Sequence, residues 1–133
     1  MVDNDVKKKK ILLVDDDEIH LTISEAILGE KYEIVATRSG EEALRYLLHN
    51  PAPNLILLDI LMPNMDGWET YNRLRAISLL QNVSVAFVSS ITEIKEKNYA
   101  YKIGAVDFIM KPVKKEDLLE RVGKILGDGG GIS

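Results

Sequence analysis

LILLDILMPNMDG, residues 55–67, contains the buried strand around which we expect the chain to fold. Four consecutive apolar residues, Leu55–Leu58, predict a strand that is covered on both faces. Asp59 follows this run directly. Because burying an unpaired charge is costly, the Asp59 carboxylate must contact water, a cation or a hydrogen-bond donor. We therefore expect neighbouring strands to bring such a group to Asp59.

Strands and helices are predicted to alternate along the chain. Short apolar, β-branched runs predict strands, and apolar residues at helical spacing predict the helices between them. The expected strands cover residues 11–14, 32–36, 55–58, 83–88 and 106–110, and the expected helices cover about 18–28, 40–49, 68–77, 93–103 and 116–126. This order favours a parallel sheet with helices on both faces, in which ligands bind beyond the carboxyl ends of the strands.

The helices carry local signals of their own. The spacing of apolar residues predicts that the first helix buries Ile19, Ile23, Ala26 and Ile27, and that the second buries Ala43, Leu44, Leu47 and Leu48. Ser39 and Glu42 are spaced as a capping box, in which each side chain bonds the backbone amide of the other residue. Thr92 is the expected cap of the fourth helix. Asp66-Gly67 should form a turn into the third helix, without a chemical role.

The composition indicates a single cytoplasmic domain. A chain of 133 residues suits one domain. It contains no cysteine, which excludes disulfide scaffolds and thiolate metal sites and fits a reducing compartment. The net charge of −4 argues against general nucleic-acid binding. Apolar runs are too short to cross a membrane, and residues 1–5 lack the pattern of a signal peptide.

The two ends of the chain differ in composition from its centre. Lys7–Lys10 is the one basic block. It could attract a polyanion, but we interpret it as part of a flexible, solvated N-terminal lead-in, residues 1–10. The domain itself is expected to span residues 11–126. Residues 127–133 contain four glycines and are expected to form a disordered tail.

Chemically active groups follow the predicted strands at one edge of the sheet. They are Asp15, Asp16, Asp17, Asp59, Ser89, Ser90 and Lys111. Clustered carboxylates repel one another by about 1–4 kcal/mol per pair at about 4 Å, so folding calls for a cation there. Oxygen ligands without histidine or cysteine suit a hard cation such as Mg²⁺. A carboxylate, a divalent cation, a lysine and a hydroxyl together favour phosphoryl transfer.

Plainer explanations exist for each of these groups taken alone. The three consecutive aspartates could cap the first helix, the serines could be ordinary strand-end hydroxyls, and Lys111 could be a surface lysine. A shared chemical role is favoured over these explanations because four strands supply suitable groups to one edge of the sheet. The chain has no glycine-rich nucleotide loop, so the phosphoryl donor should arrive on another molecule. His20 and His49 are expected on the surface, away from this edge, so a histidine nucleophile is not expected.

Five features in order resemble the receiver domain of bacterial two-component response regulators, over about Lys10 to Leu126. They are an acidic pair after the first strand (Asp15-Asp16), the run from Leu57 to Gly67 around Asp59, a small hydroxyl residue after the fourth strand (Ser89), the run Gly104–Phe108, and Lys111-Pro112. Each motif alone is weak, but all five in this order are specific.

The resemblance implies a flavodoxin-like (βα)5 fold, a doubly wound α/β domain with strand order 2-1-3-4-5. Asp59 would accept a phosphoryl group from a phosphohistidine on a sensor histidine kinase or a histidine phosphotransfer domain. Mg²⁺ or Mn²⁺ would be bound by Asp16, Asp59 and the carbonyl of Leu61, with Asp15 acting through water. The domain would be a signalling module and not an enzyme, promoting only its own phosphorylation and dephosphorylation.

The resemblance also implies a switch. Lys111, in a cis peptide with Pro112, would hold the phosphoryl group, and Ser89 would move toward it. Phe108 would then turn inward to fill the space that Ser89 leaves. The output face would consist of the helix 93–103, the strand 106–110 and the helix 116–126, which could also form a homodimer. No contact with nucleic acid or a membrane is implied.

The chain departs from the family pattern near the reactive centre. Serine at position 89 stands where threonine is frequent, and Ser90 stands where alanine is usual. Phe108 replaces the common tyrosine, so we expect it to be buried more of the time than a tyrosine. Leu61 and Ile91 flank the reactive centre, and we expect these bulky apolar side chains to shield the acyl phosphate from hydrolytic water.

Two alternative functions stay open. The aspartates after the first strand also fit the start of haloacid-dehalogenase-type phosphatases, with Asp15 as nucleophile. In that case Ile19 stands where threonine or valine is expected, and Asp59 has no role. The other alternative is an interaction module of the same fold that is not phosphorylated. The sequence also leaves open whether the chain acts alone, in a phosphorelay or as part of a larger protein.

Overall fold

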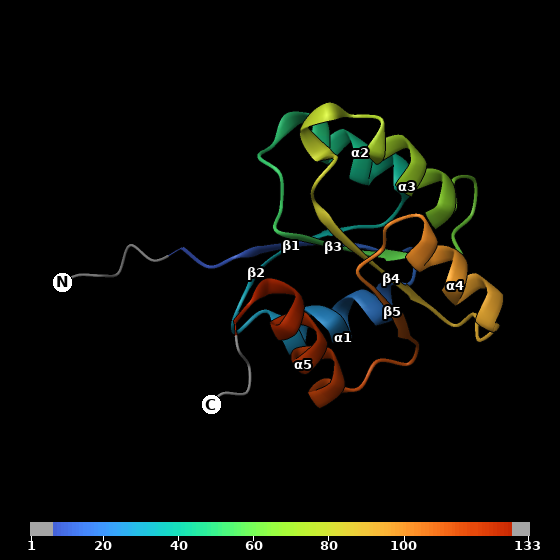
Figure 1. Ribbon diagram of the computed structural model, residues 1–133. Coiled ribbons are helices and arrows are strands. Elements are labelled where there is room, and N and C mark those ends of the chain that lie inside the picture. The colour runs from blue at the N-terminus through green and yellow to red at the C-terminus, as the bar shows by residue number, and fades with distance from the viewer. Residues whose placement is uncertain (1–6, 129–133) are drawn as a thin grey trace.

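The computed structural model describes residues 7–128, in which strands and helices alternate as predicted (Figure 1). The strands are β1 (Lys10–Val14), β2 (Glu33–Thr37), β3 (Leu55–Asp59), β4 (Ser84–Ser89) and β5 (Asp107–Met110). The helices are α1 (Glu18–Leu28), α2 (Gly40–His49), α3 (Gly67–Arg75), α4 (Ile94–Lys102) and α5 (Lys115–Leu126), with a short 3-10 helix, η1 (Ser78–Leu80), after α3.

The strands form one parallel sheet in the order β2-β1-β3-β4-β5, so the predicted fold class and strand order are confirmed. The strand order changes direction at β1, which pairs with β2 on one side and with β3 on the other. Leu57 of the central strand β3 lies opposite Leu13 of β1 and Ala86 of β4. Residues that follow β1 and β3 therefore lie at the switch point, where ligands bind in sheets of this kind.

Two layers of helices cover the sheet. Helices α2, α3 and α4 lie on one face, and helices α1 and α5 lie on the other (Figure 1). Side chains along the central strands alternate between the layers: Leu12 and Ile56 join the α2–α3–α4 core, and Leu13 and Leu57 join the α1–α5 core. Each of these side chains is almost fully buried, which stabilises the fold by about 1.5–3 kcal/mol per side chain.

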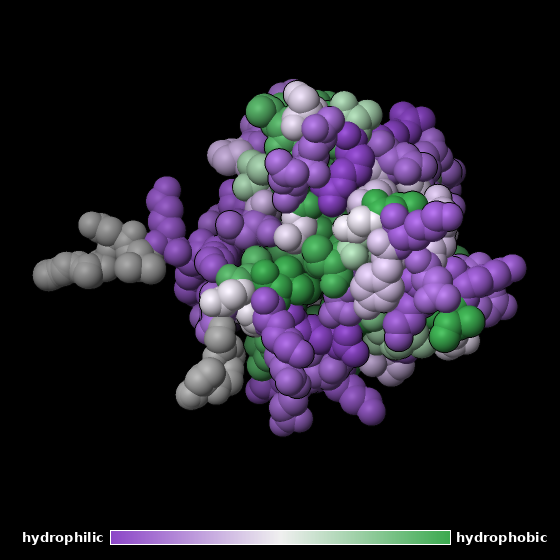
Figure 2. Space-filling model, in the orientation of Figure 1, coloured by the Kyte–Doolittle hydropathy of each residue, from purple (hydrophilic) through white to green (hydrophobic). Residues whose placement is uncertain are grey.

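Figure 2 shows hydrophilic residues over most of the visible face and one apolar region near its centre, in the part of the view where Figure 1 shows the sheet between its helix layers. Within residues 7–128, none of the helices combines the length and the hydropathy that a bilayer span requires.

Helix α1 presents a different side to the sheet from the one predicted. Its buried residues are Leu21, Ser24 and Leu28. Of the four residues expected to face the core, only Ile27 packs partly against it. The prediction failed because a small polar residue, Ser24, faces the sheet while apolar residues face outward. The residues wrongly predicted to be buried are Ile19 (72% exposed), Ile23 (45% exposed) and Ala26 in α1, and Leu48 in α2.

The helix caps follow the predictions in part. Ser39 caps α2, since its hydroxyl accepts a hydrogen bond from the Glu42 amide at 3.0 Å. The Glu42 carboxylate accepts from the amide of Arg38 at 2.8 Å and not from that of Ser39, so only half of the predicted capping box forms. Helix α4 has Glu93 at its N-cap, so the predicted cap at Thr92 was wrong.

Both ends of the described chain contact the domain. Lys10 already belongs to β1, and Lys9 Nζ lies 3.4 Å from one carboxylate oxygen of Asp128. The Tyr32 hydroxyl donates to the other oxygen of Asp128 at 2.6 Å. The predicted flexible lead-in, 1–10, and the predicted disordered tail, 127–133, thus each include residues with defined contacts. Residues 1–6 and 129–133 lie outside the part that is described.

Gly67 allows the chain to pass close to the end of β3. Its amide donates to the Ile60 carbonyl at 2.8 Å, and Asp66 caps α3 by accepting from the Glu69 amide at 2.9 Å, so the expected turn into this helix is confirmed. A Cβ atom on Gly67 would lie 2.3 Å from the Asp59 carbonyl oxygen and 2.7 Å from Cα of Ile60. A larger residue here would therefore displace the backbone of Asp59.

Replacing Gly67 by alanine should disturb the end of β3. We expect Gly67→Ala to lower the free energy of unfolding by about 1–3 kcal/mol, because overpacking a close contact forces the backbone to shift. Urea unfolding measures the loss, and the NMR shifts of the Asp59 and Ile60 amides report the displacement. In the control Gly127→Ala, φ is +72° but nothing lies within 4 Å of the added Cβ, so stability should fall without movement of these two signals. Unchanged stability and unchanged signals in Gly67→Ala would contradict this account.

Candidate functional site

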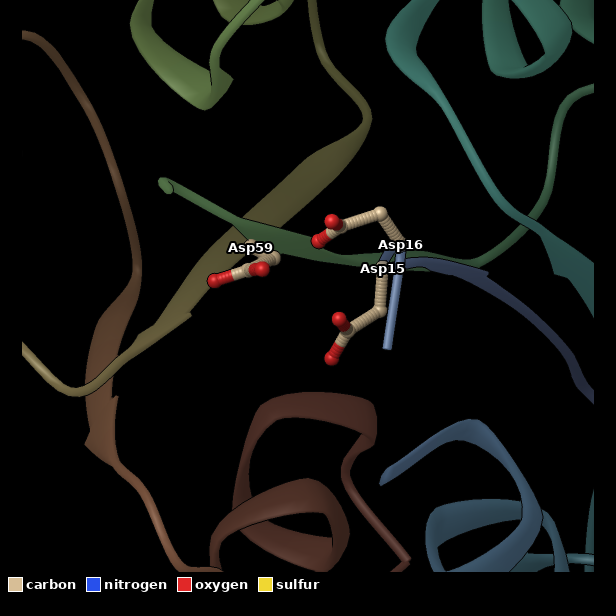
Figure 3. A group of neighbouring side chains, drawn as sticks. All are labelled: Asp15, Asp16 and Asp59. Atoms are coloured by element: carbon tan, nitrogen blue, oxygen red, sulfur yellow. The ribbon is translucent and has the colours of Figure 1, made fainter. Parts of the chain in front are cut away.

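Three carboxylates meet at the carboxyl end of the sheet. Asp15 and Asp16 follow β1, Asp59 ends β3, and carboxylate oxygens of all three lie within 4.8 Å of one another. Figure 3 shows the Asp16 side chain extending toward Asp59 and the Asp15 side chain turned toward helices α1 and α5. Asp15 and Asp59 are buried, whereas Asp16 is exposed. The structure thus brings together the aspartates that the strand pattern predicted at one edge.

Strand alternation places two of these aspartates on the same side of the sheet. Leu13 and Leu57 face the α1–α5 layer, and Asp15 and Asp59, two residues further along, continue on that side. Asp17 has a different role: its carboxylate accepts hydrogen bonds from the first amides of α1, at 3.0 and 3.3 Å, and caps the helix. The helix-capping explanation therefore applies to Asp17, which is not part of the cluster.

Lys111 supplies positive charge to the cluster. Its Nζ lies 3.0 Å from Asp15 Oδ2 and 3.4 Å from Asp59 Oδ2. The Lys111 amide donates to the Ser89 carbonyl at 2.9 Å, which ties the end of β5 to the end of β4. The peptide between Lys111 and Pro112 is cis, as predicted. The lysine is thus shared between two buried carboxylates and lies slightly closer to Asp15.

The three groups have different proton affinities. Burial, and then the charge of Asp15, raises the pKa of Asp59 to about 6. Burial opposes ionisation of Asp15 too, but hydrogen bonds from His20, from the Asp17 amide and from Lys111 outweigh it and hold the pKa of Asp15 below its ordinary value. Burial alone would lower the pKa of Lys111, but its two carboxylate partners raise it. Asp59 is therefore the more basic carboxylate, beside a lysine that stays charged.

The aspartate cluster fits a hard divalent cation. All of its side-chain donors are oxygens, the ligand type that Mg²⁺ and Mn²⁺ prefer. One lysine charge faces three aspartates, and burial together with the charge of Asp15 raises the pKa of Asp59 although Lys111 lowers it. A cation bound among these oxygens would relieve the remaining repulsion.

The two predicted switch residues, Ser89 and Phe108, lie on the side of the sheet that α2, α3 and α4 cover. Ser89 is fully buried at the end of β4, and its hydroxyl accepts from the Ile91 amide at 3.1 Å. Phe108 is buried in the core beneath α2, α3 and α4. Leu61, two residues beyond Asp59, is 56% exposed, and Ile91 is partly buried. Ser89 thus reaches the functional edge, whereas Phe108 lies deeper in the domain.

His20 belongs to this edge, although it was expected on the surface away from it. Its Nδ1 lies 2.6 Å from Asp15 Oδ2, and its side chain is only 13% exposed. Side chains on a helix lean toward the helix N-terminus, and the N-terminus of α1 follows the aspartates. Because His20 is in the first turn of α1, this direction could have predicted that its ring approaches the aspartates. His49, in contrast, is exposed and bonds the Arg45 carbonyl of its own helix, as expected.

Known proteins of similar sequence include signalling proteins. A family model described as the response regulator receiver domain matches residues 11–123. The "Two-component response regulator ORR5" of Oryza sativa subsp. japonica is 30% identical over 117 residues, with 87% of each chain covered. The "Probable cyclic di-GMP phosphodiesterase" of Vibrio cholerae is 34% identical over 118 residues, which cover 89% of this chain but 26% of that protein. The chain spans half or less of the length of the first curated relatives that it matches.

Solved structures of receiver domains are also similar to this chain. A CheY-like response regulator receiver domain protein from Methanospirillum hungatei superimposes with a TM-score of 0.81 at 30% identity, covering 93% of this chain and 98% of that one. The receiver domain of a signal transduction histidine kinase from Syntrophus aciditrophicus gives a TM-score of 0.79 at 30% identity, covering 94% and 95%.

The raised pKa of Asp59 predicts that its charge destabilises the metal-free fold. The folded-state pKa of about 6 lies above the unfolded value of about 3.9. The native state therefore holds this proton more tightly, and stability is lost as the pH rises from about 4 to about 6. We expect Asp59→Asn, which carries no charge, to be about 1–3 kcal/mol more stable than wild type at about pH 7.5 in EDTA.

Urea unfolding across this pH range measures the effect, and the gain should shrink as the pH falls toward 4. Asp16→Asn is the matched control, because Asp16 belongs to the same cluster but is exposed, so its gain should be smaller. An Asp59→Asn protein that is no more stable than wild type at the higher pH would refute the explanation.

Proposed function

The chain belongs to the response regulator receiver domain family, and on that premise we propose that it is a phosphoacceptor, with Asp59 as the residue that receives the phosphoryl group. The position of Asp59 carries the proposal. It is a buried carboxylate at the end of the central strand, with Lys111 Nζ 3.4 Å away and two further aspartates beside it. Membership of this family supports a signalling role for the chain.

In the proposed reaction a carboxylate oxygen of Asp59 attacks the phosphorus of a phosphohistidine. The new O–P bond forms as the N–P bond breaks, and the departing imidazole takes a proton from solvent. A pKa of about 6 leaves Asp59 ionised at neutral pH and more basic than an ordinary aspartate, which suits a nucleophile. The flexible side chain of Lys111 is close enough to follow charge onto the transferred group.

The proposed ligands of Mg²⁺ or Mn²⁺ are Asp16, Asp59 and the Leu61 carbonyl, with Asp15 acting through water. The bound cation would neutralise charge on the phosphoryl oxygens. An indirect role suits Asp15, since both of its oxygens already accept hydrogen bonds or ion pairs from the protein. Asp16 is exposed and is accessible to a cation from solvent.

Ser89 and Phe108 form the proposed switch. The Ser89 hydroxyl accepts from the Ile91 amide and keeps its own proton to donate to a phosphoryl oxygen. Moving an equilibrium from 1:99 to 99:1 needs about 5.5 kcal/mol of differential stabilisation. A hydrogen bond to a charged group contributes about 1.5–3 kcal/mol. The output partner must therefore supply part of the difference.

The proposed output face consists of α4, β5 and α5. Its exposed apolar side chains are Ile94, Tyr99, Tyr101, Val106 and Met110. Arg121 of α5 bonds Asp107 of β5 at 2.8 Å and Asp117 of its own helix at 2.9 Å. Apolar side chains beside charged ones suit a protein partner or a second copy of this chain.

The proposed phosphoryl donor is a sensor histidine kinase or a histidine phosphotransfer domain. It must approach the carboxyl end of the sheet, where Asp59 lies. Next to this edge, α1 exposes Ile19 and Ile23, which are four residues apart and so share one side of the helix. This exposed apolar pair is a suitable contact for the donor.

The proposal includes no enzymatic activity beyond phosphorylation and dephosphorylation of this chain in the cytoplasm. The net charge of −4 gives no general attraction for nucleic acid, and no membrane contact is proposed. Several curated relatives extend well beyond the part that this chain matches.

A small phosphodonor tests the proposal. Acetyl phosphate with Mg²⁺ should add about one phosphoryl group per chain, released by hydroxylamine as expected for an acyl phosphate. Asp59→Asn should not be labelled, because the nucleophilic oxygen is gone. Asp17→Asn, a change at the helix cap outside the cluster, should be labelled like wild type. Mass spectrometry of the intact protein measures the added group.

Other outcomes of this experiment favour the alternatives. Labelling that persists in Asp59→Asn and maps to Asp15, together with turnover of a phosphate monoester, would favour the phosphatase-like function. Absence of labelling in folded wild-type protein would favour an interaction module that is not phosphorylated.

Leu61 and Ile91 should determine how long the acyl phosphate lasts. Polar side chains at these positions would admit and orient water, so we expect the double variant Leu61→Asn, Ile91→Glu to lose its phosphoryl group about tenfold faster, or about 1.4 kcal/mol in the barrier. Decay of the label after removal of the donor measures the rate. Leu79→Asn is the matched control, because Leu79 is an exposed leucine of η1, and it should decay like wild type. A double variant that decays no faster than this control would show that the shielding idea is wrong.

A further inference from the structure

His20 is the one described histidine that contacts the aspartate cluster. Its Nδ1 lies 2.6 Å from Asp15 Oδ2, and the ring is mostly enclosed between the first turn of α1 and the strand ends. The proposed phosphoryl transfer assigns no role to it. A titratable side chain this close to a reactive centre therefore calls for an explanation.

Both carboxylate oxygens of Asp15 have partners within the protein. Oδ1 accepts from the Asp17 amide at 2.9 Å. Oδ2 faces both His20 Nδ1 at 2.6 Å and Lys111 Nζ at 3.0 Å. The two side chains that share this one oxygen differ in mobility. Lys111 is on a long flexible stem, whereas the His20 ring is on a short stem fixed to a helix.

The surroundings of the ring favour a proton on Nδ1 over a proton on Nε2. His20 Nε2 is buried and has no hydrogen-bond partner among residues 7–128. The His20 side chain lines a cavity of about 10 Å³ whose other lining residues are mostly apolar and include Leu21, Val113 and Leu118, with Asp15, Ser24 and Asp59 as the polar ones. A proton on Nε2 would be a buried donor without a partner, which costs more than an unpaired lone pair. The Nδ1–H group is then free to donate to Asp15.

We propose that His20 is a positioning residue, which fixes the Asp15 carboxylate beside the cation site before phosphorylation and keeps it there when Lys111 leaves it for the phosphoryl group. The inference rests on the proposed phosphoacceptor function. Lys111 is 3.4 Å from Asp59, so a phosphoryl group on Asp59 would compete with Asp15 for the lysine. Asp15 then loses one of the two side chains on Oδ2, and His20 remains as the donor that fixes its orientation toward the cation.

Two substitutions separate this role from simple packing. In His20→Asn, the amide nitrogen stands at the same number of bonds from Cβ as Nδ1, so a donor to Asp15 is kept. His20→Leu fills similar space without a donor. Calorimetric titration with Mg²⁺, in the absence of any phosphodonor, should show about tenfold weaker binding for the leucine variant, as is typical when a partner of a metal ligand is lost. The asparagine variant should bind within about threefold of wild type.

Phosphorylation by acetyl phosphate at saturating Mg²⁺ is the second measurement. The leucine variant should be phosphorylated about tenfold more slowly, and the asparagine variant should recover most of that rate. His49→Leu, a change to the exposed histidine on α2, is the matched control and should match wild type in both measurements. Urea unfolding establishes that each variant is folded.

NMR of the imidazole nitrogens gives a test that needs neither metal nor substitution. In metal-free wild-type protein, His20 should carry a proton on Nδ1, the nitrogen that faces Asp15. The inference is overturned by an Nδ1 that carries no proton, by a leucine variant that binds Mg²⁺ as well as wild type, or by a folded asparagine variant that is as impaired as the leucine variant. If wild-type protein is not labelled at all, the phosphoacceptor function fails, whereas the Mg²⁺ titration and the NMR signals still test His20.

Discussion

Two buried carboxylates that share one lysine are the constraint on which this structure depends. Asp15 and Asp59 lie on neighbouring strands, face the same helix layer and both reach Lys111 Nζ. Charges enclosed in this way repel each other unless a cation or a set of donors surrounds them. Several segments of the chain supply these groups. Lys111 follows β5, the Asp17 amide precedes α1, and His20 belongs to the first turn of α1. Gly67 lets the start of α3 pack closely against the backbone at the end of β3.

Much of this architecture could be predicted from the sequence because it depends on simple periodicities. Leu55–Leu58 is apolar at every position because both faces of β3 are covered, and the helices follow in regular alternation. In a parallel sheet, the residues that follow the strands lie at the same edge. The positions of Asp59 and Lys111 at the ends of their strands were therefore enough to predict that they approach each other. The strand order itself came from the resemblance to a family, since alternation of strands and helices is compatible with more than one order.

The parts that could not be predicted depend on how a helix is rotated and on which donor reaches which acceptor. In α1 the apolar residues Ile19 and Ile23 form a regular pattern, yet the buried side contains Ser24. Pattern alone cannot distinguish an apolar side that packs on the sheet from one that is exposed for a partner. The same rotation decides that His20 points back to Asp15. Glu42 shows a similar limit, because its carboxylate bonds the amide next to the expected one.

The ends of the described chain lie together at the edge of the sheet opposite Asp59. β1 begins there, α5 finishes there, and Lys9, Tyr32 and Asp128 hold the two ends to each other. Attachment at either end therefore leaves the aspartate edge accessible. A domain with this geometry can be joined to unrelated modules, or immobilised through a tag on a sensor surface, without rebuilding its reactive centre. Tolerance of fusion is thus a property of the fold, and it suits a family in which some relatives are two to four times as long as the matched part.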